Sequence, residues 1–206
     1  MSAIPPPSSN ARTATLIRTT KETGISVAIN LDGTGQSTIA SGVGFPDHML
    51  TALSKHSSID ITLNCKGDLH IDDHHSVEDI GLALGECVKK ALGEKSGIRR
   101  FGFASVPLDE ALSQATVDLS GRACFSAIGT DKLGKGKVGT FDVELMEDFL
   151  SAFASASGTT LHIDIRSGRN CHHMIEATFK AFARALREAT ELDPRASGVP
   201  STKGVL

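Results

Sequence analysis

Two stretches of the chain carry a pair of adjacent histidines with a glutamate shortly after it. These sets are His74, His75 and Glu78, and His172, His173 and Glu176. The second set repeats the first at an offset of 98 residues, since 172 − 74 = 98 and 176 − 78 = 98. On an α-helix, a histidine and the glutamate four residues later lie on one face, with Cβ atoms about 5–6 Å apart. Such a face can bind a divalent metal through nitrogen and oxygen, and Mn²⁺, Fe²⁺ and Zn²⁺ all suit that combination.

Adjacent histidines on a helix diverge by about 100°, so the two members of a pair cannot easily bind the same ion. We therefore expect two ions, each taking one histidine and a glutamate from a helix. Two further histidines, His48 in PDHML and His162 in TLHID, lie in segments that can bring them to the same place. A single such set would usually be an exposed helix turn, but its recurrence amid diverged neighbours favours a metal site. Asp72 and Asp73 are candidate helix caps or hydrogen-bond partners of the ligands.

Basic and hydroxyl side chains form a second group with a common chemistry. Arginine, lysine, serine and threonine bind phosphate through guanidinium, ammonium and hydroxyl groups. Beside a metal site, such side chains indicate a phosphorylated substrate. The candidates are Arg99, Arg100, Arg122, Lys180, Ser201, Thr202 and Lys203.

The elements that must position these residues occur in the same order in both halves of the chain. Period-2 alternation predicts strands, and apolar stripes at helical spacing predict helices that begin with the two histidine sets. The first helix and the next strand of each half align at an offset of 100 residues, as Leu50 with Leu150 and Ile61 with Leu161. The predicted strands lie within 13–31, 59–67, 103–120, 122–129 and 159–168, and the predicted helices within 46–57, 72–93, 143–157 and 171–189.

This repeat predicts an α+β fold with an internal duplication. Each half would form an antiparallel sheet with helices on one face, and the helices would be sandwiched between the two sheets. We expect one compact domain with a disordered N-terminal tail at 1–11, repeat halves at 12–96 and 97–192, and a C-terminal tail at 193–206 that contributes to the phosphate site. We interpret 32–45 as a turn-rich connector. The segment GKGKVG at 134–139 matches a nucleotide-binding pattern by letter only, so we interpret it as a flexible hairpin loop.

The composition is that of an ordinary globular protein, with 206 residues that are 40% hydrophobic and 22% charged and a net charge of −3. The mild charge and the absence of tryptophan and tyrosine argue against nucleic acid binding. No apolar run reaches the roughly 20 residues that span a bilayer. The four cysteines are scattered without a CxxC pair, which indicates reduced thiols and a cytoplasmic setting.

Seven segments of the chain belong together: FPDHML, GDLHIDDHHSVEDIGLALG, LDEAL, LSGR, TLHI, CHHMIEATFKAFARAL and STKGVL. In combination they resemble the imidazoleglycerol-phosphate dehydratase family of histidine biosynthesis, over roughly residues 12–206. The resemblance implies an enzyme with two Mn²⁺ ions that converts imidazole glycerol phosphate to imidazole acetol phosphate and water. It also implies a homo-oligomer of twenty-four subunits in cubic symmetry, with active sites shared between subunits.

Carried over residue by residue, the resemblance implies eight metal ligands and a pairing between them. One ion would be bound by His74, His162, His172 and Glu176, and the other by His48, His75, Glu78 and His173. The resemblance also implies phosphate binding by Arg100, Arg122, Lys180, Ser201 and Lys203. It implies an acid/base role for Glu22, with Glu78 and Glu176 as alternatives. Ala52 stands where relatives carry a glutamine, which leaves one substrate contact open.

Two other functions fit the same residues. A dinuclear hydrolase of phosphate esters could use the same ligands, and it would release phosphate, which a dehydratase does not. A non-catalytic assembly joined by metal ions would fall apart on chelation and would not depend on the phosphate-binding residues. The basic residues and the intact KET segment at 21–23 favour the dehydratase.

Overall fold

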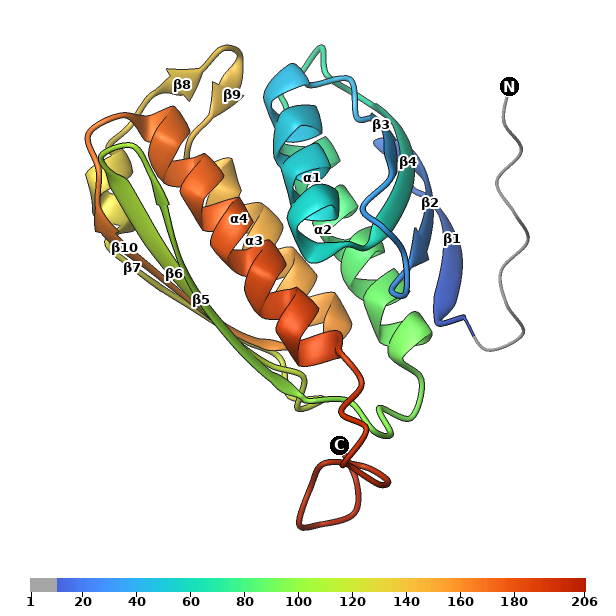
Figure 1. Cartoon of the computed structure of the whole chain (residues 1–206). Helices are drawn as coiled ribbons and strands as arrows, with labels where there is room; N and C mark the ends of the chain where they lie inside the picture. The colour runs from blue at the N-terminus through green and yellow to red at the C-terminus, as the bar shows by residue number, and fades with distance from the viewer. Residues whose placement is uncertain (1–10) are drawn as a thin grey trace.

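The computed structural model describes residues 11–206, and the predicted tail at 1–11 lies outside the described residues except for Ala11. Within that range, two four-stranded sheets form the outer layers and four long helices fill the space between them (Figure 1). This arrangement confirms the predicted α+β sandwich with an internal duplication. Among the described residues, no helix is long and apolar enough to cross a membrane.

The first half contributes one sheet and two helices. Its elements are β1 (Thr13–Thr19), β2 (Thr23–Asn30), β3 (Ser37–Ala40), α1 (Gly44–Ser57), β4 (Asp60–Gly67) and α2 (His74–Leu92). The sheet order is β1-β2-β4-β3. Every second residue of β2 is buried, as the predicted alternation requires, and α2 packs on this sheet.

The second half repeats this arrangement with an insertion. Its corresponding elements are β5 (Phe101–Leu108), β6 (Ala111–Asp118), β7 (Cys124–Ile128), α3 (Leu145–Ser157), β10 (Thr160–Ser167) and α4 (Cys171–Thr190). The sheet order, β5-β6-β10-β7, matches that of the first half. The insertion consists of a short 3-10 helix, η1 (Thr130–Leu133), and a hairpin of β8 (Lys137–Val138) and β9 (Phe141–Asp142). The segment 134–139, interpreted as a hairpin loop, is thus part of a hairpin, but it supplies the first strand, and the turn follows at 139–140.

The sheets differ from the prediction in one respect, because each is mixed rather than purely antiparallel. Strand β3 runs parallel to β4 and β7 runs parallel to β10, while the other pairs are antiparallel. The sequence analysis missed β3 because its four residues lie among turns. Parallel neighbours need a crossover connection, and α1 and α3 provide it in the two halves.

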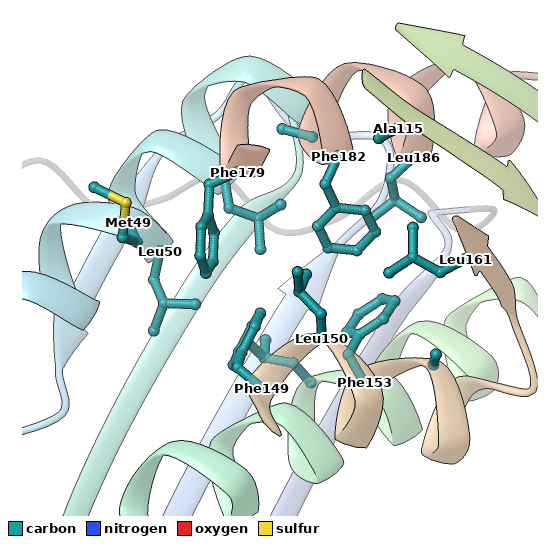
Figure 2. Packing of buried hydrophobic residues seen from close by; sticks show 14 of the residues in the cluster. Met49, Leu50, Ala115, Phe149, Leu150, Phe153, Leu161, Phe179, Phe182 and Leu186 are labelled. Carbon is teal, nitrogen blue, oxygen red and sulfur yellow. The ribbon is translucent and has the colours of Figure 1, made fainter. Parts of the chain in front are cut away.

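The helices join the two halves through a continuous apolar core. Helix α1 packs against α4, and α2 packs against α3, so each pair takes one helix from each half. Aromatic rings fill the space between α3 and α4 (Figure 2): Phe149 lies 5.3 Å from Phe179 and Phe153 lies 5.0 Å from Phe182, measured between ring centroids. The positions of the helix ends therefore depend on packing between the repeats.

Helix α2 approaches α3 closely at two glycines that lie one turn apart. A Cβ atom on Gly81 would lie 2.6 Å from the carbonyl oxygen of Phe149, and one on Gly85 would lie 2.5 Å from that of Phe153. Both neighbouring atoms belong to the backbone, so they cannot turn aside. The two glycines therefore set the spacing between α2 and α3.

We predict that Gly85→Ala lowers the free energy of unfolding by about 1–3 kcal/mol, because the added methyl group overpacks the contact between the helices. Urea unfolding followed by circular dichroism measures this loss. Gly136→Ala is the matched control, since a Cβ atom at Gly136 meets nothing within 4 Å. Equal free energies of unfolding for the two variants would show that α2 and α3 can move apart without a loss of stability.

Candidate functional site

Both histidine sets lie on first helical turns, at the end of the molecule where α2 and α4 begin (Figure 1). The side chain of Asn170 accepts hydrogen bonds from the backbone amides of His172 and His173, at 2.9 and 3.4 Å. The side chain of Asp72 accepts one from the amide of His74 at 2.9 Å. These bonds satisfy amides that a first turn leaves unpaired, so they fix where each helix begins. The predicted capping role of Asp72 is confirmed.

The first cluster of candidate ligands lies between α1 and α4 and is called the α1–α4 cluster (His48, His172 and Glu176). The Nε2 atoms of His48 and His172 lie 3.3 and 3.1 Å from the same carboxylate oxygen of Glu176. One ligand atom from each residue lies within 4.8 Å of the others. Two atoms bound to one transition metal ion lie at most about 4.4 Å apart, twice the metal–ligand distance. Small side-chain shifts would let this cluster bind a divalent ion.

Glu176 is ionised within the α1–α4 cluster. Burial is the largest single influence and would raise its pKa, but the ion pair with Lys180 and the hydrogen bonds with His48 and His172 lower the pKa of Glu176 to about 2. The ammonium of Lys180 donates to the other carboxylate oxygen at 2.7 Å. One oxygen of an anionic group thus faces both imidazoles and can bind a cation.

The second cluster lies between α2 and α3 and is called the α2–α3 cluster (His74, Glu78 and Asp148). Nδ1 of His74 lies 3.6 Å from a carboxylate oxygen of Asp148, and Nε2 of His74 lies 3.7 Å from one of Glu78. The sequence analysis missed Asp148. This residue occupies the position in the second half that His48 occupies in the first, since 148 − 48 = 100, the offset that aligns the two helices. That offset is the signal that could have revealed it.

The second histidine of each pair, His75 or His173, lies outside both clusters. Nδ1 of His75 lies 3.0 Å from a carboxylate oxygen of Asp68, and Nδ1 of His173 lies 2.9 Å from one of Glu110. Nε2 of His75 lies 3.9 Å from the carboxylate of Glu22. Because adjacent helical residues diverge, each chain turns these two histidines away from its own clusters.

Glu22 lies in the turn between β1 and β2, and buried hydrogen bonds hold this turn on α2. Asp79 of α2 accepts hydrogen bonds from the hydroxyl of Thr23 and from the guanidinium of Arg18, whose Nη2 atom lies 2.7 Å away. The hydroxyl of Thr20 accepts a hydrogen bond from the amide of Glu22 at 3.1 Å. The turn therefore presents the Glu22 carboxylate beside the first turn of α2.

Within one chain, the structure groups the predicted ligands differently from the predicted pairing in two ways. The prediction assigned His48 and His172 to different ions, whereas the structure places them in one cluster. The prediction also included His162, which lies on β10 between the buried residues Leu161 and Ile163. Because successive side chains of a strand point to opposite faces, His162 points outward from the sheet and joins neither cluster.

Four of the five predicted phosphate-binding residues line one hollow beside the C-terminal segment. Its lining includes Arg100, Arg122, Ser201, Thr202 and Lys203. The guanidinium of Arg100 is held there by Asp118 at 2.7 Å and donates to the carbonyl oxygen of Pro200 at 2.9 Å. Lys180 lies elsewhere, because it is on α4 and is paired with Glu176.

The C-terminal segment, beside which the hollow lies, is at the opposite end of the helices from the first turns of α2 and α4 (Figure 1). The α1–α4 cluster lies at the first turn of α4, and the C-terminal segment follows the last turn of the same helix. A helix rises 1.5 Å per residue, so the 20 residues of α4 separate the two places by roughly 30 Å. A small substrate bound in the hollow cannot reach a cluster of the same chain.

The chain is similar to known proteins over most of its length. A family model described as imidazoleglycerol-phosphate dehydratase matches residues 41–186. A relative of that name from Gluconacetobacter diazotrophicus is 58% identical over 95% of this chain and 98% of its own length. Another of that name, from Granulibacter bethesdensis, is 55% identical over 95% of this chain and 99% of its own length.

Solved structures extend the similarity to the fold. The structure of imidazoleglycerol-phosphate dehydratase from Staphylococcus aureus has a TM-score of 0.79 at 39% identity, and the match covers 88% of this chain and 99% of that one. The structure of IGPD from Pyrococcus furiosus has a TM-score of 0.78 at 38% identity, and the match covers 93% of this chain and 100% of that one. The family model, the curated relatives and the solved structures all agree. The chain therefore belongs to the imidazoleglycerol-phosphate dehydratase family.

Proposed function

We propose that this protein dehydrates imidazole glycerol phosphate to imidazole acetol phosphate in histidine biosynthesis. The observation that carries the proposal is the α1–α4 cluster, whose ligand atoms lie close enough together for a metal ion, in a chain of this family. The basic hollow beside the C-terminal segment suits the phosphate of such a substrate. The family relatives carry the name of the same activity. We place the enzyme in the cytoplasm, in agreement with its four free cysteines.

We propose that two divalent ions, both Mn²⁺, bind at the two clusters. The α1–α4 cluster would supply two nitrogens and one oxygen. In the α2–α3 cluster, Asp148 and Glu78 face different nitrogens of His74, so a rotation of side chains would have to bring both oxygens to the nitrogen that binds the ion. Imidazole together with carboxylate suits Mn²⁺, which prefers oxygen-rich shells over thiolates. The bound ions would act as Lewis acids toward the imidazole ring of the substrate and make proton loss from the ring easier.

We further propose that each active site is shared between subunits of a homo-oligomer. The hollow lies about a helix length from the clusters, so a substrate whose phosphate binds in one chain must meet the clusters of another. His75 and His173 point away from their own clusters, and His162 is exposed on β10, so these three predicted ligands could complete the ligand sets of a neighbouring copy. An assembly of twenty-four subunits, as the resemblance implies, would provide such contacts.

Glu22 is our candidate for the acid/base group. A dehydration must move a proton at carbon, and a carboxylate outside the metal shells is suited to that task. Glu22 is about half exposed on a hairpin that is fixed to α2. Glu78 and Glu176 belong to the clusters, where they would be occupied as ligands.

We predict that protein stripped of metal by a chelator forms no ketone from imidazole glycerol phosphate, and that added Mn²⁺ restores the reaction. Ketone and free phosphate are measured together in each sample. Release of phosphate would identify a hydrolase instead. Loss of assembly on chelation, with no product under any condition, would identify a structural role for the metal.

We predict that Glu22→Gln lowers kcat by about 10²- to 10⁴-fold, because the amide cannot accept the proton. The affinities for Mn²⁺ and for substrate should stay close to those of the wild type, since the side chain keeps its size. Steady-state kinetics and equilibrium binding measure the two effects. Glu86→Gln is the control, because Glu86 is half-exposed on α2 and, among residues 11–206, its salt bridge is with Lys90 alone. An unchanged kcat in Glu22→Gln would remove Glu22 from the mechanism.

We predict that Asp148→Ala loses one of the two Mn²⁺ ions, because the α2–α3 cluster loses a ligand oxygen while the α1–α4 cluster is untouched. Equilibrium dialysis followed by metal analysis measures the number of ions per chain. Glu144→Ala is the matched control, since Glu144 is exposed and precedes the same helix. Full metal content in Asp148→Ala would exclude this residue as a ligand.

A further inference from the structure

The outward-facing histidine of each pair is held by a carboxylate from a different element. A carboxylate oxygen of Asp68, which follows β4, lies 3.0 Å from Nδ1 of His75. A carboxylate oxygen of Glu110, in the turn between β5 and β6, lies 2.9 Å from Nδ1 of His173. These contacts use the ring nitrogen nearer the backbone. In each ring, Nε2 remains as the outer nitrogen.

The two carboxylates do not correspond to each other in the internal repeat. The strands β4 and β10 align at an offset of 100, so the counterpart of Asp68 is Gly168. The strands β2 and β6 begin at 23 and 111, an offset of 88, so the counterpart of Glu110 is Glu22. The same contact to Nδ1 is thus made from unrelated positions. The duplication alone therefore does not explain why both histidines have a carboxylate at Nδ1. A need for such a partner that is common to the two histidines does explain it.

Both carboxylates are placed to accept a hydrogen bond from Nδ1 of their histidine, and Glu110 is held in that place by two backbone amides. An ionised carboxylate can only accept hydrogen bonds, so Nδ1 of each ring must carry the proton and donate it. In a neutral imidazole, Nε2 then carries the lone pair that a metal ion needs.

We propose that Asp68 and Glu110 are positioning residues that hold the rings of His75 and His173 in the tautomer and orientation in which Nε2 binds metal. The inference rests on the metal-dependent function proposed above. The other oxygen of Asp68 is buried and has no hydrogen-bond partner among the described residues. A buried oxygen without a hydrogen bond lowers the stability of the folded chain. The contact of the remaining oxygen with His75 explains why an aspartate is nevertheless present at this position.

Glu110 offers a substitution that changes the tautomer while it preserves the loop. Its second oxygen accepts hydrogen bonds from the backbone amides of Arg169 and Asn170, at 3.1 and 2.9 Å. In Glu110→Gln, the side-chain oxygen of the glutamine would stay beside these two backbone N–H groups, because its side-chain nitrogen cannot accept their hydrogen bonds. The amide nitrogen would then donate to Nδ1 of His173. That ring would have to carry its proton on Nε2, where the proton blocks metal binding.

The test measures Mn²⁺ binding to full-length, metal-free protein by competition with a chelating dye. We expect Glu110→Gln to weaken the binding of one ion by about 10- to 100-fold, with an unfolding midpoint of the metal-free protein equal to that of the wild type. Excess Mn²⁺ should restore its activity. Asp68→Ala should weaken the other ion by a similar factor, and it carries the test if Glu110→Gln fails to fold. Glu86→Gln is the control for loss of one negative charge.

The outcomes separate this inference from the proposed function. Mn²⁺ affinity equal to that of the wild type in both Glu110→Gln and Asp68→Ala would overturn the inference alone. Wild-type protein that binds no Mn²⁺ would overturn the metal-dependent function and the inference together. Weakened binding that excess Mn²⁺ overcomes would support both.

Discussion

Adjacent histidines on an α-helix point about 100° apart, and the rest of the site is arranged around that divergence. The first histidine of each pair faces carboxylates of a cluster within its own chain. The second faces outward, where a carboxylate from a neighbouring loop contacts its Nδ1 atom. On each of α2 and α4, one histidine of the pair therefore points into a cluster and the other points outward. The two helices together give two clusters and two outward histidine rings.

Core packing fixes the geometry of the clusters. Each cluster takes one helix from each half of the chain, so its ligand distances depend on how closely α1 and α4, or α2 and α3, approach. Glycines of α2 set its approach to α3, and phenylalanine pairs fill the space between α3 and α4. All four helices begin at the same end, where the positive ends of their dipoles favour negative charge. The apolar core and the polar site are therefore parts of one arrangement.

Features that repeat or alternate could be predicted from the sequence, whereas features that depend on single contacts could not. The two histidine sets, the helices and the long strands each form a pattern that extends over many residues. Strand β3 is too short for such a pattern. Asp148 was missed because it differs in type from its counterpart His48. The exclusion of Lys180 from the hollow depends on its ion pair with Glu176, and side-chain pairing of this kind is visible only in the folded chain.

Each half of the chain packs its two helices against helices of the other half, and this has a consequence for the origin of the protein. A chain of one repeat could not have formed either cluster alone, because each cluster needs a first helix from one repeat and a second helix from the other. Two such chains related by a twofold axis would have formed both clusters at once, as an identical pair. In a symmetric dimer of identical chains, the positions of His48 and Asp148 would carry the same residue. In a single fused chain the two positions can differ, as they do here.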